Sequence, residues 1–220
     1  DHKRAYEGDE GPNTGGMGAY SDAALELPFM SEGEYREAVD VLRETVDALD
    51  GYKGVLYGQF MLTADGIRVV EFNARFGDPE AMNTLPVLGT DFLDVLVAAR
   101  EGDSLPQLTF ARQATVCKYA VPAGYPTDPE AGARVTIDED SAGDALLYYA
   151  SVDERDDGIY TTTSRSFAVV GVADSITEAE EIAEAAMGEA GEEGLRVRHD
   201  IGKPDLVQQR IDHMAELRGE

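Results

Sequence analysis

The chain of 220 residues carries 44 Asp and Glu against 18 Lys and Arg, which gives a formal net charge of −26 at pH 7. So large a negative charge excludes nonspecific binding to nucleic acid or to an anionic membrane surface. It fits a protein kept soluble by surface carboxylates, as in cytoplasms with high salt, where screening weakens self-repulsion. The length and the 43% content of hydrophobic residues suffice for one large or two small domains.

The single cysteine, Cys117, excludes an internal disulfide and a multi-cysteine metal site. No uncharged apolar run approaches the roughly 20 residues of a membrane span, and no signal peptide is visible. We therefore expect a cytoplasmic protein that binds no membrane. Because the chain begins at Asp1 rather than at methionine, within a stretch rich in functional residue types, we expect a fragment or a cleaved piece of a longer protein.

The first twenty residues combine cationic side chains with glycine. Asp1-His2-Lys3-Arg4 brings three cationic or potentially cationic groups into an acidic protein, although a frayed terminus is the alternative reading. Residues 8–20, GDEGPNTGGMGAY, hold five glycines, which permit positive φ and close backbone approach to a ligand. The stretch lacks the Gly-Lys-Ser/Thr ending of a P-loop, so a Walker-type NTPase is not supported. A floppy surface loop is the alternative.

The next elements are predicted from periodicity and from helix-end signals. A capping box at Ser31 and Glu34 starts a helix that runs to about Leu49. Its apolar stripe, expected to be core, is Tyr35, Val39, Leu42, Val46 and Leu49. Strands at 55–63 and 67–75 with a tight turn at Asp65-Gly66 form an antiparallel hairpin. A helix from residue 90 or 91 to 102 and a linker at 103–108 follow.

The second strand of that hairpin continues into the sequence VVEFNARFGDPE, residues 69–80. Apolar and polar residues alternate, so we expect one face in a core and the other face to present Glu71, Asn73 and Arg75. Alternate residues lie roughly 6.5–7 Å apart, so Glu71 and Asn73 can share a small cation through their oxygens. Arg75 can hold an anion beside it, a combination that suggests Mg-nucleotide chemistry. The alternative is a half-exposed strand with a surface Glu–Arg pair.

Gln59, on the first strand of the hairpin, lies near the same region. It can be read as a third oxygen ligand or as an ordinary surface glutamine.

The second half of the chain is predicted as α+β. Strands are expected at 114–121, 134–137, 145–151, 159–163, 167–173 and 195–197, with a turn at 156–158. A second capping box at Thr177 and Glu180 opens one helix, and a final helix covers about 205–217. His199 and His213 lack a ligand-spaced partner, so we interpret both as structural or surface residues.

Four segments together resemble the glycinamide ribonucleotide synthetases, the phosphoribosylamine–glycine ligase family of ATP-grasp enzymes. These are DHKR (1–4), GPNTGGMGAY (11–20), GVLY (54–57) and EFNARFGDPE (71–80). YAVPAGYP, residues 119–126, is similar to the start of that family's C-terminal domain. The resemblance implies an α+β fold in which residues 1–106 are the C-terminal part of an ATP-grasp domain, an antiparallel sheet with helices. Residues 107–220 would form a small α+β C-terminal domain.

The resemblance also implies the reaction. ATP phosphorylates the glycine carboxylate, and the amine of 5-phosphoribosylamine then displaces phosphate from glycyl phosphate to form the amide. The implied cofactors are ATP and Mg²⁺ or Mn²⁺, with metal ligands at Glu71 and Asn73 and catalytic cations at Arg75 and Lys3. The implied partner is the upstream half of the same enzyme, which supplies most adenine contacts, so the isolated chain is expected to be inactive.

Further site residues follow only from the resemblance. His2 and Arg4 would add cationic contacts to the nucleotide, and Gly15, Gly16 and Gly18 would bring backbone N–H groups to the substrates. Substrate contacts are implied at Asn13 and Thr14, and an ammonium of glycine or of the ribosylamine at Asp78 and Glu80. The family tends to have a small residue where Gln59 stands. Two alternatives stay open: another ATP-grasp carboxylate–amine ligase, and a non-catalytic fragment that acts as a binding module.

Overall fold

The computed structural model describes residues 1–24, 26–135, 142–189 and 194–220. The chain forms two compact units, each assembled from three separate segments. Unit 1 is Asp1–Ala23, Asp78–Pro86 and Gln113–Leu206, and unit 2 is Ala24–Gly77, Val87–Arg112 and Val207–Glu220. Since the units alternate along the chain, they divide it differently from the expected sequence domains 1–106 and 107–220, which stay a prediction.

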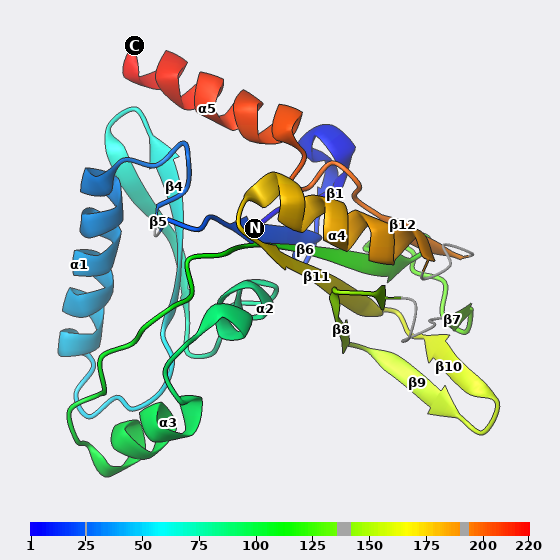
Figure 1. The fold of residues 1–220 in the computed structure, drawn as a ribbon, viewed down its shortest axis with the longest axis horizontal. Helices are drawn as coiled ribbons and strands as arrows, with labels where there is room; N and C mark the ends of the chain where they lie inside the picture. Colours follow the sequence, from blue (N-terminus) through cyan, green and yellow to red (C-terminus); the bar gives the residue numbers. More distant parts are fainter. Residues whose placement is uncertain (25, 136–141, 190–193) are drawn as a thin grey trace. The chain divides into compact units, whose positions relative to one another are not determined.

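Unit 1 is built on an antiparallel sheet whose central strand is β6 (Ala114–Pro122) (Figure 1). On one side, β6 pairs with β11 (Phe167–Ala173), which pairs with β8 (Leu146–Tyr149). On the other side, β3 (Gly18–Ser21) pairs with the first half of β6 and β12 (Leu195–Val197) with its end. Every residue of β6 is buried, including the polar Thr115 and the charged Lys118.

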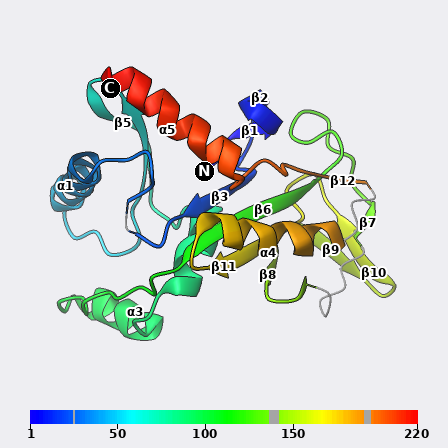
Figure 2. The ribbon, with the colours of Figure 1, turned by 45° about the horizontal axis from the view of Figure 1, so that its top comes forward.

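Helix α4 (Ile176–Glu189) lies along β6 and β11 in both views (Figures 1 and 2). Most of its buried side chains are small or flexible, namely Ala179, Ala183, Ala186 and Met187, and Ile176 and Glu180 are buried beside them. A Cβ atom on Gly171 of β11 would lie 1.9 Å from the backbone oxygen of Ala179. The close packing of helix on sheet therefore requires glycine at position 171.

The start of α4 differs from the prediction. Ser175 caps the helix: its Oγ accepts a hydrogen bond from the Glu178 amide at 3.2 Å and donates to Glu178 Oε2 at 2.9 Å. The capping box predicted at Thr177 and Glu180 is therefore wrong, because the same Ser-x-x-Glu pattern occurs two residues earlier. Glu180 turns inward instead and ion-pairs with Lys118 at 2.6 Å.

A second sheet of unit 1 has the order β7 (Arg134–Val135), β10 (Gly158–Thr161), β9 (Val152–Arg155). β9 was not predicted, because three of its four residues are charged and such residues rarely favour a strand. The two-residue turn at 156–157 nevertheless pairs Arg155 with Gly158. Of the strand predicted at 134–137, the last two positions lie outside the described residues.

The predicted glycine-rich loop at 8–20 is mostly strand. β1 (Arg4–Tyr6), a 3₁₀ turn η1 (Glu7–Asp9) and β2 (Glu10–Asn13) form a small two-stranded sheet, and β3 begins at Gly18. Only residues 14–17 connect β2 to β3 without regular structure. The short helix α2 (Glu80–Thr84), followed by η2 (Leu85–Val87), is fixed to the sheet by buried Asn83, whose amide donates to Ala19 O at 3.1 Å.

Unit 2 contains helix α1 (Glu32–Ala48) beside the hairpin of β4 (Tyr57–Thr63) and β5 (Gly66–Asn73) (Figure 1). Its other helices are α3 (Phe92–Glu101) and most of α5 (Pro204–Arg218). The Ser31–Glu34 capping box is confirmed. The hairpin turn occupies residues 64–65, one position before the predicted turn. In the described part of the chain, no helix has the length and apolar character needed to cross a membrane.

Two apolar faces of unit 2 are more exposed than predicted. In the α1 stripe, Val46 and Leu49 are exposed. On β5, Val70 and Phe72 are 53% and 39% exposed, so the expected core face of this strand is wrong. A bulge explains part of the difference: Gln59 pairs with Glu71 but Phe60 pairs with Val69, which leaves Val70 as an extra residue. A two-stranded sheet also buries little surface by itself.

Candidate functional site

The end of β5 brings together the two side chains predicted to bind metal. The Asn73 amide nitrogen donates to Glu71 Oε1 at 2.9 Å, so both head groups lie on the same side of the strand. This agrees with the two-residue alternation read from the sequence. Gln59 is directly opposite Glu71 in the ladder, and residues opposite each other share a face. The hypothesis of a third ligand at Gln59 stays a prediction.

The Glu71–Asn73 pair fits a hard divalent cation. Glu71 is exposed and therefore open to a hydrated ion, and carboxylate and amide oxygens are the donors that Mg²⁺ and Mn²⁺ prefer. Rotating the side-chain amide of Asn73 by 180° would exchange its nitrogen and oxygen and place the oxygen next to Glu71. If both residues bind the ion, phosphate oxygens and water would supply its remaining ligands. Among the described residues, no three His, Cys, Asp or Glu side chains gather as a metal cluster.

Arg75 lies beyond the strand, because β5 ends at Asn73 rather than at 75 as predicted. Its Nη1 donates to the backbone oxygen of Phe76 at 2.6 Å, and the side chain is exposed. Thus Glu71 and Asn73 occupy a regular strand, whereas Arg75 is held by the turn that follows it.

The amides of the turn at residues 14–17, in unit 1, already have hydrogen-bond partners within that unit. Thr14 Oγ1 donates to Lys3 O at 2.8 Å and accepts from the Gly16 amide at 3.0 Å, while the Gly15 amide donates to Tyr125 Oη at 3.2 Å. A Cβ on Gly16, at φ +120°, would lie 2.7 Å from Pro79 Cδ. The substrate contacts predicted for the Gly15 and Gly16 amides stay a prediction. To make them, the two amides must first break their hydrogen bonds to Tyr125 Oη and Thr14 Oγ1.

Gly18 is part of β3 rather than of the turn. A Cβ there would lie 2.2 Å from Cys117 O, so the glycine permits the close strand pairing. Its predicted ligand contact stays a prediction as well.

Arg165, which is not among the predicted site residues, joins this turn to Asp78. Its Nη1 lies 3.2 Å from the backbone oxygens of both Gly15 and Gly16. The guanidinium also holds Asp78 through two bonds, Nη1 to Oδ1 at 3.1 Å and Nη2 to Oδ2 at 2.7 Å. Tyr119 Oη donates to Asp78 Oδ1 at 2.9 Å, and its ring centroid lies 4.4 Å from Arg165 Cζ.

No local signal marks Arg165, which lies in TTTSRSF, 87 residues from Asp78 in sequence. Its partners become neighbours only when β3, β6 and β11 form one sheet. Asp78 therefore already binds a cation, although 47% of its side chain remains exposed. The ammonium-binding roles predicted for Asp78 and for Glu80, the first residue of α2, stay predictions.

The residues at the start of the chain have different environments. Lys3 Nζ lies 2.5 Å from Asp1 Oδ2, and Arg4 Nη1 donates to Gly11 O at 2.8 Å. His2 is only 5% exposed, and burial lowers its pKa to about 4, opposed by Asp9, whose Oδ1 lies 3.5 Å from Nδ1. Burial disfavours the charged form of the imidazole, and the contact predicted from His2 to the nucleotide stays a prediction.

The remaining predicted residue of this region, Asn13, is the exposed last residue of β2. His199 and His213 are structural and surface residues, as expected. His199 Nδ1 lies 2.7 Å from Glu184 Oε1. The other oxygen of Glu184, Oε2, lies 2.5 Å from Nζ of the buried Lys118. His213 is exposed on α5.

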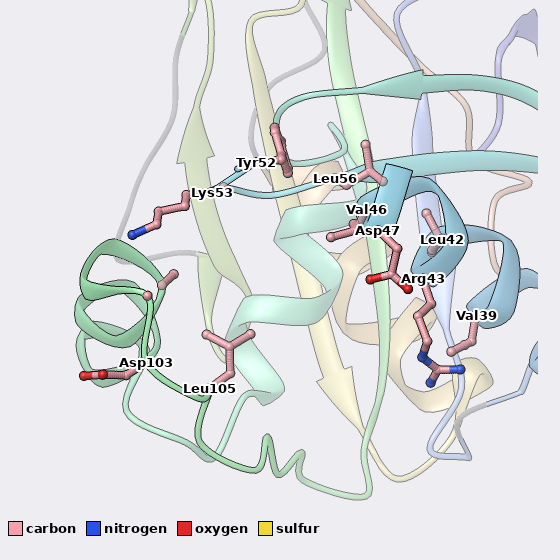
Figure 3. Close-up of a pocket in the computed structure, with 13 residues that line it drawn as sticks. Val39, Leu42, Arg43, Val46, Asp47, Tyr52, Lys53, Leu56, Asp103 and Leu105 are labelled. Carbon is pink, nitrogen blue, oxygen red and sulfur yellow. The ribbon is translucent and has the colours of Figure 1, made fainter. Parts of the chain in front are cut away.

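Unit 2 also has an open cavity of about 600 Å³ (Figure 3). Val39, Leu42 and Val46 of α1 line it together with Leu56 and Leu105. Lys53 also lines the cavity, and its Nζ donates to the backbone oxygen of Arg100 on α3 at 2.7 Å. None of the residues predicted to bind metal, nucleotide or substrate lines this cavity.

Comparison with family models matches both parts of the chain. Residues 1–81 match "Phosphoribosylglycinamide synthetase, ATP-grasp (A) domain" and residues 115–204 match "Phosphoribosylglycinamide synthetase, C domain". Curated proteins named phosphoribosylamine–glycine ligase are similar over the whole chain: one from Methanosarcina barkeri is 55% identical over 100% of this chain and 51% of its own length. One from Methanocaldococcus jannaschii is 51% identical over 99% of this chain and 50% of its own length.

The chain thus spans about half the length of the curated relatives it matches. Among solved structures, the phosphoribosylamine–glycine ligase of Thermotoga maritima is similar with a TM-score of 0.76 and 28% identity, over 91% of this chain and 50% of that one. A biotin carboxylase from Campylobacter jejuni has a TM-score of 0.63 at 14% identity, over 91% of this chain and 46% of its own. The second likeness concerns the fold alone, which is α+β with the ATP-grasp architecture, as predicted.

Proposed function

The chain belongs to the phosphoribosylglycinamide synthetase family, and on that premise we propose that the full-length protein carrying it is an ATP-dependent ligase that joins glycine to 5-phosphoribosylamine. The γ-phosphoryl group of ATP passes to a carboxylate oxygen of glycine, and ADP leaves. The amine nitrogen then attacks the acyl carbon, a proton is lost from that nitrogen, and phosphate departs. The products are glycinamide ribonucleotide, ADP and phosphate.

The proposal assigns Mg²⁺ or Mn²⁺ to Glu71 and Asn73. The 2.9 Å contact between their head groups, on one face of a regular strand, is the observation that supports it most. When bound, the divalent ion offsets the negative charge of the ATP phosphates during phosphoryl transfer. Arg75, exposed in the next turn, orients the anionic phosphoryl or acyl-phosphate oxygens. Lys3, with Arg4, adds positive charge on the unit that carries the glycine-rich turn.

Within unit 1, the proposal assigns substrate contacts to the glycine-rich turn and to Asp78. The turn, with Asn13, Thr14 and the glycines, approaches the substrates and excludes water that would hydrolyse the acyl phosphate. Asp78 is half-exposed, so its carboxylate can accept an ammonium, with Glu80 next to it on α2. The half of the relatives that this sequence does not match would complete the nucleotide site. The expected cytoplasmic location stays a prediction.

The test is glycine-dependent release of ADP by the full-length protein in the presence of ATP, 5-phosphoribosylamine and either Mg²⁺ or Mn²⁺. We expect release only when both the acid and the amine are present, and formation of the amide by mass spectrometry. Failure of glycine to stimulate ADP release would overturn the assignment. Turnover with a different acid or amine, but not with this pair, would instead support another ATP-grasp carboxylate–amine ligase.

A further inference from the structure

We propose that Arg165 is a positioning residue of this site, which holds the Gly15-Gly16 turn and the Asp78 carboxylate in one arrangement. We call the group of Arg165, Gly15, Gly16, Asp78 and Tyr119 the Arg165 clasp. The inference rests on the proposed function, because it assigns to Arg165 a task in presenting Asp78 to a substrate. All five residues belong to unit 1.

The contacts of Arg165 are those of a positioning group rather than a substrate-binding one. Its side chain is 14% exposed, whereas that of Asp78 is 47% exposed. Nη1 serves two backbone oxygens and one carboxylate oxygen, and Nη2 serves the other carboxylate oxygen. A bidentate guanidinium fixes both the position and the rotation of a carboxylate. The substrate therefore meets Asp78, and Arg165 decides how Asp78 is oriented.

Tyr119 fixes the plane of the guanidinium. Its ring centroid lies 4.4 Å from Arg165 Cζ, a cation–π distance, and its hydroxyl donates to Asp78 Oδ1 at 2.9 Å. Burial raises the pKa of Tyr119, although the charge of Arg165 opposes this, so the hydroxyl remains a donor at physiological pH. Because Tyr119 is on the fully buried strand β6, the clasp is anchored in the core of unit 1.

The turn depends on the same side chain. The carbonyl oxygens of Gly15 and Gly16 face Arg165, and a Cβ on Gly15 would lie 3.3 Å from its Cζ. Loss of the guanidinium removes the partner of two carbonyls and of one carboxylate at once. We therefore expect the turn and Asp78 to lose their order together. A lysine cannot replace the arginine, because its single nitrogen cannot reproduce the two nitrogens of Arg165 that bind both oxygens of Asp78 while Nη1 also serves the turn.

The experiment compares Arg165→Met and Arg165→Lys with a matched control, Arg155→Met, in the full-length protein. Arg155 also pairs with an aspartate, Asp153 at 2.8 Å, and stacks on a tyrosine ring, Tyr160 at 4.1 Å, but it lies in the β9–β10 hairpin. We expect both Arg165 variants to lose about 10- to 100-fold in kcat/KM for glycine or for the amine, the range for residues that orient a ligand. The KM for ATP should change less than about twofold, and Arg155→Met should match the wild type.

A double variant tests whether Arg165 acts on turnover through Asp78 or independently of it. Arg165→Met combined with Asp78→Asn should be no slower than the slower single variant. Multiplied effects, or a normal kcat/KM in both Arg165 variants, would overturn the proposal.

Amide hydrogen exchange of peptides covering residues 11–18 gives a readout without turnover. Exchange should be faster in Arg165→Met and Arg165→Lys, and unchanged in Arg155→Met. Unchanged exchange in both Arg165 variants would overturn the clasp even if activity fell. Conversely, wild-type protein without glycine-dependent turnover would remove the proposed function, while the exchange measurement would still decide whether Arg165 holds the turn.

Discussion

Glu71 and Asn73 place one carboxylate and one amide at the end of β5, and of the two only the carboxylate carries charge. Glu71→Gln keeps the shape of the side chain and one acceptor oxygen but removes its charge. Changes to residues that merely orient a metal ligand lower activity by 10- to 100-fold. We therefore expect a loss of at least about 100-fold in metal-dependent kcat, with a melting temperature close to that of the wild type.

The control for this prediction is Glu44→Gln, which removes an exposed carboxylate from α1. It should leave both kcat and the melting temperature unchanged. Full activity in Glu71→Gln at limiting Mg²⁺ would remove the metal assignment, and equal losses in both variants would point to net charge instead.

His2 provides a pH prediction at the same scale. Burial lowers its pKa from 6.5 to about 4, so between these values the unfolded chain binds a proton that the folded chain does not. The free energy of unfolding should therefore fall as the pH drops from 6.5 toward 4, by about 3 kcal/mol in all from this one group. The stabilisation is fully present above pH 6.5 and is lost below pH 4.

NMR titration of the imidazole Hε1 protons checks this directly, since the chain has only 3 histidines to assign. A midpoint near 6.5 for His2 would contradict the prediction. His2→Gln should flatten the decrease of melting temperature between pH 6.5 and 4.

At the level of elements, two glycines near α4 predict opposite effects of the same substitution. Gly171→Ala places a methyl group 1.9 Å from Ala179 O, so the helix must move off β11 and stability should fall by about 1–3 kcal/mol. Gly188 is the second-last residue of α4, and an added methyl group there would have no atom within 4 Å. Gly188→Ala should raise stability by up to about 0.5 kcal/mol, because alanine favours helix and the last turn gains less than the middle of a helix. Urea unfolding of the two variants gives both values, and equal signs would contradict the packing described.

Which elements could be predicted follows from where their signals lie. α1 and β11 carry periodicity and end signals within their own residues, and the structure has them at the predicted positions. β9 consists mainly of charged residues and forms only because a two-residue turn pairs it with β10. The exposure of Val46 and Leu49 on α1 could not be predicted either, because amphipathicity predicts an apolar face but not which other elements pack against it.

The residues of the candidate site likewise differ in whether a local sequence signal or only the tertiary fold brings them together. Glu71 and Asn73 are two residues apart on one strand, so alternation alone placed them together. Arg165 and Gly15 are separated by 150 residues, and only the pairing order of the sheet makes them neighbours. Residue types at His2-Lys3-Arg4 predicted positive charge, but burial, which is a tertiary property, makes His2 neutral.

For the whole molecule, the net charge of −26 predicts a strong dependence of stability on salt. Raising KCl from about 0.1 M to about 1 M shortens the screening length from about 10 Å to about 3 Å and weakens repulsion among the carboxylates. We expect the melting temperature to rise by about 5 °C or more, equivalent to roughly 1–3 kcal/mol for a chain of this size. A protein of similar length with a net charge near zero serves as the control. A melting temperature that falls or stays constant would contradict the prediction.

The pairing of β3 with β6 has a consequence for protease digestion. β3 lies near the beginning of the chain and β6 after its midpoint, yet they are adjacent strands of one sheet. A single cut in the irregular stretch 103–108 therefore divides the covalent chain but not unit 1. The two halves should co-elute as one nicked particle under native conditions and separate only in denaturant.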